Sequence, residues 1–316
     1  MRVLYFGTPG FAVPTLAALL DSSHTVVGVV TQPDRARGRG QHVTFAPVKQ
    51  LAVDRGLPVL QPERLKEPAA LDAMRALGAD IGVVAAYGKL LPQSLLDLPP
   101  LGMVNVHASL LPRWRGAAPI HRAIIAGDAE TGVTIMRVVL ALDAGPMLSR
   151  VSVPIDDAVT SDHLEVQLAE AGAQLLVHTL DAIASGTATE TPQDEEGVTY
   201  AARLERRDGQ IDWTHSAAAI HNQIRGLHPW PLTSVLWRGK RLILRSSAVG
   251  AADDARRGAP GTIIALDADA LVVATGTGTL RVREVQLEGR RAQSAREFIN
   301  GARPAEGDVF APLPLL

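Results

Sequence analysis

Residues 103–119 read Met-Val-Asn-Val-His-Ala-Ser-Leu-Leu-Pro-Arg-Trp-Arg-Gly-Ala-Ala-Pro, and this stretch determines how the rest of the chain is interpreted. Its first part, residues 102–108, has the apolar composition of a buried strand, and the Pro, Arg and Gly residues that follow predict a loop. Asn105 and His107 are two residues apart, so their side chains project from the same face of that strand. The stretch predicts a carboxamide and an imidazole near a strand's carboxyl end, where open α/β sheets bind ligands.

A carboxylate is expected close to this pair. Asp143 lies in loop 142–145, after a second apolar run at residues 133–140 that we predict to be a strand. An amide can stabilise an oxyanion, an imidazole can move protons near neutral pH, and a carboxylate can orient the imidazole. Ser109 lacks a nucleophile elbow such as G-x-S-x-G. We therefore expect Asn105, His107 and Asp143 to catalyse group transfer at a carbonyl carbon, with the attacking group supplied by a substrate.

Apolar runs alternate with helical patterns as far as residue 185. Strands are expected at residues 3–6, 26–30, 58–60, 81–85, 102–108, 133–140 and 147–153, and helices at residues 11–20, 47–55, 69–77, 117–126 and 161–185. This order predicts an α/β fold, a doubly wound and mostly parallel sheet of the Rossmann-like kind. The first turn, Gly7–Gly10, is not G-x-G-x-x-G, so a dinucleotide site has little support.

The composition changes at residues 187–197, which are rich in Thr, Pro, Gln and acidic residues and predict a linker continuing towards Arg207. Beyond it, one helix at residues 217–224 precedes strands at 234–237, 241–244, 262–266, 271–274 and 280–287. Short strands without intervening helices predict a small β-barrel, although composition alone does not separate a barrel from a sandwich. We expect a catalytic domain at 1–189, a linker at 190–207 and a C-terminal β-barrel domain at 208–316.

Charge is distributed unevenly between these parts. The net charge is −2, but residues 206–316 hold 15 Lys and Arg against 11 Asp and Glu, whereas residues 1–205 hold 16 against 22. The C-terminal part is therefore the better partner for a polyanion, although an ordinary surface imbalance explains the charge equally well. A second cationic feature is the glycine-rich loop 31–41 with Arg35, Arg37 and Arg39, which could fit a phosphate backbone or be only a solvated loop.

Several classes of site are not expected. The chain has no cysteine, which excludes thiol catalysis and Cys-ligated zinc, and the histidines show no metal-ligand spacing, so we expect no metal. No apolar run approaches the roughly 18 residues of a membrane span, and no signal-peptide pattern is present, so we expect a cytoplasmic protein. At the end of the predicted strand 81–85, Tyr87 and Gly88 could flank a flat heterocycle, or Tyr87 could simply cap the core.

The motif Asn-x-His-x-Ser-Leu-Leu-Pro-x-x-Arg-Gly from Asn105, with Leu-Asp-x-Gly at 142–145, resembles the signature of the folate-dependent formyltransferase superfamily. Other stretches resemble the superfamily members that act on methionyl-tRNA: Phe6–Pro9, Thr31–Arg35 with Gly38–Gly40, Ala86–Gly88, Gly127–Thr134, Ile211–Trp213 and Pro229–Pro231. The resemblance runs from Arg2 to about residue 310. It departs at Gly10, where relatives often carry an acidic residue, and this concerns only the start of the first helix.

The resemblance implies an enzyme that transfers the formyl group of 10-formyltetrahydrofolate to the α-amino group of methionine on initiator methionyl-tRNA, for translation initiation. Tetrahydrofolate would be the second product, and no metal and no obligate protein partner are implied. It further implies folate contacts from Ser109, Leu110, Leu111, Pro112, Tyr87 and Gly88, tRNA contacts from Arg35, Arg37 and Arg39, and an OB-like barrel that holds the tRNA.

Three alternatives remain open at this point. A formyltransferase acting on an amino-sugar nucleotide would share the signature, and the basic loop at 31–41 speaks against it. An NAD-dependent oxidoreductase would also be doubly wound, and the missing G-x-G-x-x-G motif speaks against it. A non-enzymatic tRNA-binding protein would explain the barrel and the basic loop, but it would leave Asn105, His107 and Asp143 without a role.

Overall fold

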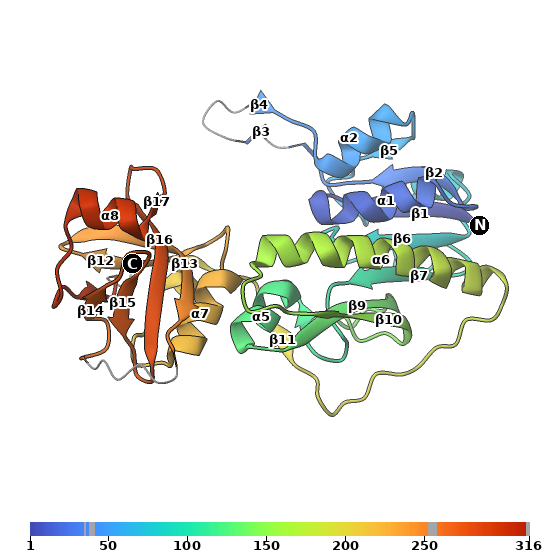
Figure 1. The fold of residues 1–316 in the computed structure, drawn as a ribbon. Coiled ribbons are helices and arrows are strands. Elements are labelled where there is room, and N and C mark those ends of the chain that lie inside the picture. Colours follow the sequence, from blue (N-terminus) through green and yellow to red (C-terminus); the bar gives the residue numbers. More distant parts are fainter. Residues whose placement is uncertain (35, 38–41, 252–257, 314–316) are drawn as a thin grey trace. The chain divides into compact units, whose positions relative to one another are not determined.

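The computed structural model describes residues 1–34, 36–37, 42–251 and 258–313, with only the backbone described for 36–37 and 42–43. The chain forms two compact units (Figure 1). The first unit comprises residues 1–119, 131–154 and 165–201, and the second comprises 120–130, 155–164 and 202–316. The predicted domain boundaries at 189 and 208 stay a prediction.

A seven-stranded sheet forms the centre of the first unit, in the order β10-β9-β7-β6-β1-β2-β5. Its strands are β1 (Arg2–Gly7), β2 (Thr25–Val30), β5 (Val59–Leu60), β6 (Ile81–Ala85), β7 (Met103–His107), β9 (Glu130–Arg137) and β10 (Met147–Pro154). The five strands from β5 to β7 pair in parallel, whereas β9 is antiparallel to β7. The prediction of a doubly wound, mostly parallel sheet is therefore confirmed.

The chain reverses direction across this sheet at β1. It runs from β1 to β2 and β5 on one side, and then returns to β6 and β7 on the other. Such a switch point opens a crevice at the carboxyl ends of the strands, where ligands bind in doubly wound folds. The fold thus brings the residues after Gly7, Ala85 and His107 to the same edge of the sheet.

The other elements as far as residue 201 are helices and short ladders. They are η1 (Gly10–Ala12), α1 (Val13–Leu20), α2 (Pro47–Asp54), α3 (Pro68–Ala76), α4 (Gln93–Leu96), α5 (Pro119–Ala126, mostly in the second unit) and α6 (Ser161–Ala184). The pair β3 (Ala36–Arg37) and β4 (His42–Val43) is antiparallel, and the pair β8 (Arg115–Gly116) and β11 (Tyr200–Ala201) is parallel. The four-residue α4 and both ladders were not predicted, because their patterns are too short to read from sequence.

Helix α6 covers one face of β7. A side chain at Gly172 of α6 would lie 3.0 Å from Val106 and 3.2 Å from Val133, so the glycine permits close helix–sheet packing. Alternation along β7 then turns Met103, Asn105 and His107 to the other face. Met103 packs there in a core cluster with Phe6, Tyr87 and residues of α4.

The prediction of a strand at residues 133–140 was wrong at its carboxyl end, because β9 stops at Arg137. The Arg137 N–H bonds to the carbonyl of Pro146, so the chain leaves the sheet after Arg137 and returns at β10. A side chain at Gly145 would lie 1.9 Å from the Arg137 carbonyl oxygen, so only glycine allows this close approach. The apolar run continues beyond the strand because Val138 packs against the core from the loop.

The second unit is built on an antiparallel sheet in the order β14-β15-β16-β13-β12-β18. Its elements are η2 (Arg206–Gly209), α7 (Ala217–Gly226), β12 (Thr233–Trp237), β13 (Lys240–Val249), β14 (Ile263–Leu266), β15 (Leu271–Ala274), β16 (Thr279–Leu287), β17 (Gln293–Ser294), α8 (Ala295–Ala302) and β18 (Phe310–Ala311). A bridge between Thr262 and Val309 and a 2.8 Å bond from Phe310 N–H to the Gly261 carbonyl join its two ends. The sheet therefore curls into a small barrel, as the OB-like prediction requires.

No helix in the described ranges is both long and apolar enough to cross a membrane.

Gly132 of β9 gives a test of this packing. A Cβ atom there would lie 2.0 Å from the Val151 carbonyl oxygen of β10 and 2.6 Å from a methyl group of Leu110. Because backbone atoms cannot move aside cheaply, we expect Gly132→Ala to lower the free energy of unfolding by about 1–3 kcal/mol in urea denaturation. Gly10→Ala is the matched control, since a Cβ atom there meets nothing within 4 Å. Equal stability of the two variants would contradict the described contact between β9 and β10.

Candidate active site

Unusual backbone conformations occur in three loops of the first unit around β7. Ala86, Trp114 and Asp143 have φ angles of 45°, 65° and 47°, and they lie in the loops after β6, β7 and β9. A positive φ costs energy for a residue with a side chain and persists where surrounding contacts impose it, as at active sites. The loop after β7 begins after the predicted catalytic residue His107, and the loop after β9 contains the predicted catalytic residue Asp143.

Asn105 and His107 lie on the predicted shared face of β7. The imidazole of His107 is buried, whereas Asn105 is half-buried. Within the described ranges, no hydrogen bond holds the Asn105 carboxamide, which therefore keeps its donors for a ligand. Next to a buried imidazole, such a carboxamide can meet negative charge that develops on a bound carbonyl oxygen.

The imidazole of His107 is fixed by a backbone carbonyl. Its Nε2 atom lies 3.0 Å from the carbonyl oxygen of Trp114. Because a carbonyl only accepts, Nε2 must carry the hydrogen of this bond. The other ring nitrogen, Nδ1, lies 3.8 Å from Oδ2 of Asp143. Nδ1 is therefore the ring nitrogen that can exchange a proton with a substrate or with Asp143. The distance of 3.8 Å between Nδ1 and Oδ2 is longer than a hydrogen bond, as is common for catalytic groups when no substrate is bound.

Asp143 is held by the loop that follows β7. Its Oδ2 atom accepts a 2.8 Å hydrogen bond from the N–H of Gly116. The side chain is only 15% exposed, so this carboxylate acts in a partly dry environment. The bond joins the loop after β9 to the loop after β7, and it brings the Asp143 carboxylate to His107.

The loop of residues 108–112 is tied to β9 by Thr134. The Thr134 hydroxyl donates to the Ser109 carbonyl at 2.7 Å and accepts from the Leu111 N–H at 3.2 Å. The Ser109 hydroxyl donates to the Arg113 carbonyl at 2.6 Å, and Ser109 is fully buried. Ser109 is therefore bound within the loop, and its hydroxyl is not presented to a substrate as a nucleophile.

The residues predicted to contact folate differ in their exposure to solvent. Leu110 and Pro112 are half-buried and Gly88 is exposed, whereas Leu111 is buried with Ser109. The ring of Tyr87 is buried against Phe6 with ring centroids 5.6 Å apart, and burial raises the pKa of its hydroxyl to about 12. The residue as a whole is buried, and its carbonyl accepts a 3.0 Å hydrogen bond from the Gln32 side chain.

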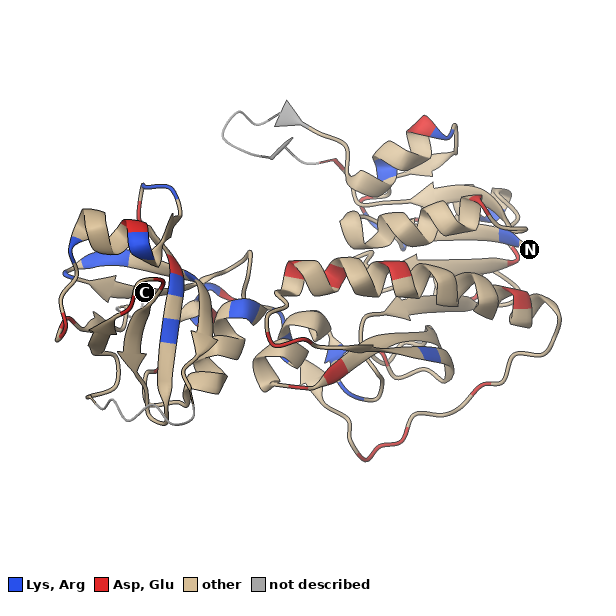
Figure 2. Ribbon diagram, in the orientation of Figure 1, with Lys and Arg blue, Asp and Glu red and all other residues tan. Residues whose placement is uncertain are grey.

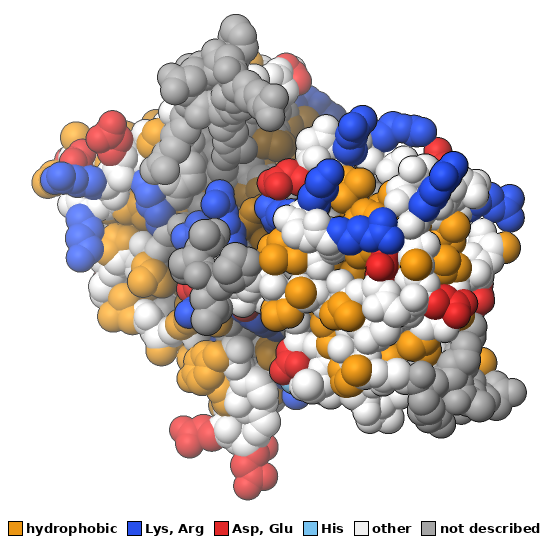
Figure 3. Space-filling view, turned by 90° about the vertical axis from the view of Figure 1, so that its left-hand side faces the viewer, with side chains coloured by type: hydrophobic (Ala, Val, Ile, Leu, Met, Phe, Trp, Pro, Cys, Tyr) orange, Lys and Arg blue, Asp and Glu red, His pale blue; other side chains and the backbone are white. Residues whose placement is uncertain are grey.

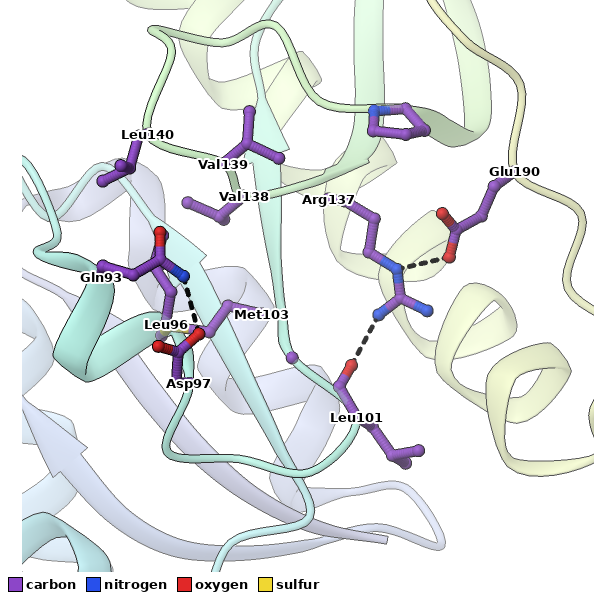
Figure 4. Close-up of a pocket in the computed structure, with 12 residues that line it drawn as sticks. Gln93, Leu96, Asp97, Leu101, Met103, Arg137, Val138, Val139, Leu140 and Glu190 are labelled. Atoms are coloured by element: carbon purple, nitrogen blue, oxygen red, sulfur yellow. Dashed lines mark hydrogen bonds and ion pairs between the residues drawn. The ribbon is translucent and has the colours of Figure 1, made fainter.

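The structure also has a pocket that the sequence did not reveal. It has a volume of about 500 Å³ (Figure 4). Apolar side chains of Leu96, Met103 and residues 138–140 line it, and an Arg137–Glu190 ion pair of 2.7 Å stands at one side. Both ends of loop 138–146 line this pocket. Asp143 lies between these ends in the sequence and is not one of the lining residues. The sequence feature that corresponds to this pocket is the apolar run 133–140, which by its pattern predicts a strand.

The predicted tRNA-contacting arginines are only partly described. Arg35 and Arg39 lie outside the described residues, and Arg37 is described only as backbone of β3. The preceding residue, Asp34, forms an ion pair with Lys49, and Gln61 donates to Asp34 at 3.1 Å and to the Gln32 carbonyl at 2.9 Å. These contacts fix the start of the loop that carries the arginines.

The ion pair at Asp34 makes a pH-dependent prediction. The hydrogen bond from Lys49 holds the pKa of Asp34 below its usual range. A lowered carboxyl pKa contributes stability above the unfolded value of about 3.9, and this stability is lost as the pH falls through the folded value. We expect Lys49→Met to lower the free energy of unfolding by about 2 kcal/mol at pH 7, with the deficit shrinking in more acidic buffer.

Urea denaturation at several pH values checks this, with Lys66→Met as the control because Lys66 is exposed. If the loss in free energy of unfolding did not depend on pH, or if Lys66→Met showed the same loss, the ion pair between Asp34 and Lys49 would not be the source of this stability.

Comparisons with known proteins show the family to which the chain belongs. Residues 1–180 match the family described as Formyl transferase, and residues 203–303 match Formyl transferase, C-terminal domain. The chain is 48% identical over 307 residues to a methionyl-tRNA formyltransferase of Magnetococcus marinus, covering 97% of each chain. It is 46% identical over 314 residues to that of Symbiobacterium thermophilum, covering 99% of this chain and 96% of the other.

Solved structures share the fold at low sequence identity. HypX from Aquifex aeolicus, solved in complex with tetrahydrofolic acid, has a TM-score of 0.64 at 16% identity over 95% of this chain and 47% of the other. WlaRD, a sugar 3N-formyl transferase, has a TM-score of 0.68 at 16% identity over 92% of this chain and 99% of the other. With both family domains present and nearly half of the residues identical over almost the full length, this chain belongs to the formyl transferase family and, within it, to the methionyl-tRNA formyltransferases.

Proposed function

We propose that this enzyme transfers the formyl group of 10-formyltetrahydrofolate to the α-amino group of methionine on initiator methionyl-tRNA in the cytoplasm, releasing tetrahydrofolate. The observation that carries the proposal is the convergence beside β7 of the Asn105 carboxamide, to which no other described residue forms a hydrogen bond, with the buried His107 and with Asp143. Ser109 is engaged inside its loop, which supports direct attack by the substrate amine rather than a covalent enzyme intermediate.

The proposed chemistry assigns one step to each group. The α-amino group has an ordinary pKa of about 7.7–8.0, so a useful neutral fraction attacks the formyl carbon near pH 7. Asn105 donates to the oxygen of the tetrahedral intermediate, and Nδ1 of His107 stabilises the charge on the same oxygen. Asp143 accepts the proton released by the attacking amine and passes it, through water, to the departing folate nitrogen. The new bond from the formyl carbon to the amine is already present in the tetrahedral intermediate; when the intermediate collapses, the carbonyl re-forms and the bond from the formyl carbon to the folate nitrogen breaks.

The donor fits the pocket shown in Figure 4. A reduced pterin is flat with polar edges, and pockets for such ligands are concave and mostly apolar, with volumes of about 300–1,000 Å³. Leu96, Met103 and Val138 supply the apolar wall, and the backbone of loop 138–146 supplies polar groups. A pterin there would direct the rest of the folate towards Asp143, with Leu110, Pro112 and Gly88 as further contacts.

The acceptor is assigned to cationic parts of the chain. Lys and Arg residues occur along the strands of the second unit, whereas α6 contains Asp and Glu but no Lys or Arg (Figure 2). They also gather on part of the face drawn in Figure 3. Phosphates bind such surfaces with a strong dependence on salt. We propose that Arg35, Arg37 and Arg39 contact the acceptor end, and that the barrel contacts the body of the tRNA.

The other candidate functions are less well supported. Family membership leaves the NAD-dependent oxidoreductase and the non-enzymatic tRNA-binding protein without support. An amino-sugar nucleotide acceptor rests on structures of 16% identity, which show the fold alone, whereas the relatives at 46–48% identity are methionyl-tRNA formyltransferases.

A direct assay tests the acceptor. We expect the purified chain to form formylmethionyl-tRNA from 10-formyltetrahydrofolate and initiator methionyl-tRNA, and chromatography of the released amino acid measures it. An amino-sugar nucleotide under the same conditions should give no product above background. Formylation of the sugar nucleotide alone would overturn the acceptor and leave the transfer chemistry standing.

Substitutions at the three catalytic residues test the mechanism. We expect Asn105→Ala, His107→Ala and Asp143→Asn each to lower kcat by at least about a hundredfold, because each removes a group that acts on the transition state. Steady-state kinetics with both substrates measures the change, and thermal unfolding confirms the fold. Asn222→Ala in the second unit is a matched amide control. Near-normal turnover in one of the three variants would show that its assigned role is wrong.

A further inference from the structure

One extended segment contacts several parts of the candidate site. Residues 190–201, which we call the strap, follow α6 and its connection in the first unit (Figure 1). Glu190 pairs with Arg137, Thr191 forms a bridge with Met147, and the Thr199 hydroxyl accepts from the Trp114 N–H at 2.8 Å. Tyr200 and Ala201 then form β11 beside β8. The linker at 190–207 stays a prediction, and within it residues 190–201 belong to the first unit and contact the candidate site.

Gln193 lies at the centre of the strap and uses the full hydrogen-bonding capacity of its carboxamide. Its Nε2 atom donates to the carbonyl oxygens of Asp143 and Gly145, each at 2.8 Å. Its Oε1 atom accepts from Nε and Nη2 of Arg115 at 3.0 and 2.8 Å. One side chain therefore connects the loop that carries Asp143 to the loop that carries Gly116, whose N–H holds the Asp143 carboxylate.

The loop at Asp143 depends on such an external contact. Asp143 has a positive φ, and Gly145 lies so close to Arg137 that a side chain there would clash. A strained loop keeps one conformation only when surrounding contacts over-determine it. The Gly116 N–H holds the Asp143 carboxylate, and Gln193 holds the backbone carbonyls of Asp143 and Gly145. Removing Gln193 leaves two carbonyls without their donor and frees the loop to shift.

We propose that Gln193 is a positioning residue that holds the backbone of Asp143 and Gly145 so that the Asp143 carboxylate faces Nδ1 of His107. This inference rests on the proposed transfer reaction, in which Asp143 moves a proton. Gln193 does not touch substrate, and it acts only through Asp143. Its effect should therefore fall on turnover rather than on binding, since a displacement of about 1 Å at a reacting group costs about a hundredfold in rate.

Two substitutions separate the donor and acceptor sides of the carboxamide. Gln193→Ala removes all four hydrogen bonds. Gln193→Glu keeps the length of the side chain and an acceptor for Arg115, but it cannot donate to the carbonyls of Asp143 and Gly145. If the contact to Asp143 is what matters, both variants lose activity; if only the contact to Arg115 matters, the Glu variant keeps it. Glu195→Ala is the control, because Glu195 is an exposed residue of the same strap.

Kinetics with 10-formyltetrahydrofolate and methionyl-tRNA measure the outcome. We expect both Gln193 variants to lower kcat by about 10- to 100-fold while the KM for each substrate stays within about twofold, and we expect Glu195→Ala to match wild type. In an enzyme that already carries Asp143→Ala, adding Gln193→Ala should lower kcat little further, because the two residues act as one unit. If Gln193→Ala fails to fold, the kcat of the isosteric Gln193→Glu variant tests the proposal instead.

Wild-type kcat in Gln193→Glu would overturn the inference, as would a full additional loss in the Asp143→Ala background. Either result would leave the proposed function intact if the wild-type enzyme still formylates methionyl-tRNA. Absence of that reaction in the wild-type enzyme would instead refute the function itself.

Discussion

The hydrogen bond from the backbone N–H of Gly116 to the carboxylate of Asp143 sets the position of that carboxylate in the candidate site. It connects the loop after β7 to the loop after β9, two segments 27 residues apart in the chain. Only glycine suits position 116, because its φ is 121° and a Cβ atom would lie 2.8 Å from the Ala201 carbonyl oxygen. Without this bond, the sheet would still place Asn105 and His107 together, but the carboxylate would lack its fixed position beside the imidazole.

In this site, backbone groups hold the catalytic side chains in position, and the side chains remain available for the reaction. Backbone groups of Trp114 and Gly116 fix the imidazole and the carboxylate, which leaves one ring nitrogen of His107 and the carboxamide of Asn105 for the reaction. Because these groups are set before substrate arrives, little reorganisation is required when charge develops on the formyl oxygen. Burial also matters, since a water-poor site strengthens the interaction between His107 and Asp143.

The sequence predicted the parts of this site that depend on local periodicity. The two-residue repeat of a strand places Asn105 and His107 on one face, and the alternation of strands and helices predicts the sheet that carries them. Contacts between distant segments could not be predicted in this way. Residues 138–140 continue an apolar run and were assigned to a strand, although the close approach of Gly145 to Arg137 turns them into a pocket wall. Gln193 lies in a polar segment that reads as a linker, and only its contacts with Asp143 and Arg115 reveal its place.

A crystal structure with a non-reactive 10-formyl folate analogue would test the central claim most directly, because that claim is about where the reacting carbonyl lies. We expect the pterin against Met103 and Val138, and the formyl oxygen about 3 Å from Nδ2 of Asn105 and close to Nδ1 of His107. The Asp143 carboxylate should keep its bond to the Gly116 N–H. A folate bound at the Gly7–Gly10 turn, or a formyl oxygen turned away from Asn105 and His107, would contradict the assignment of the active site.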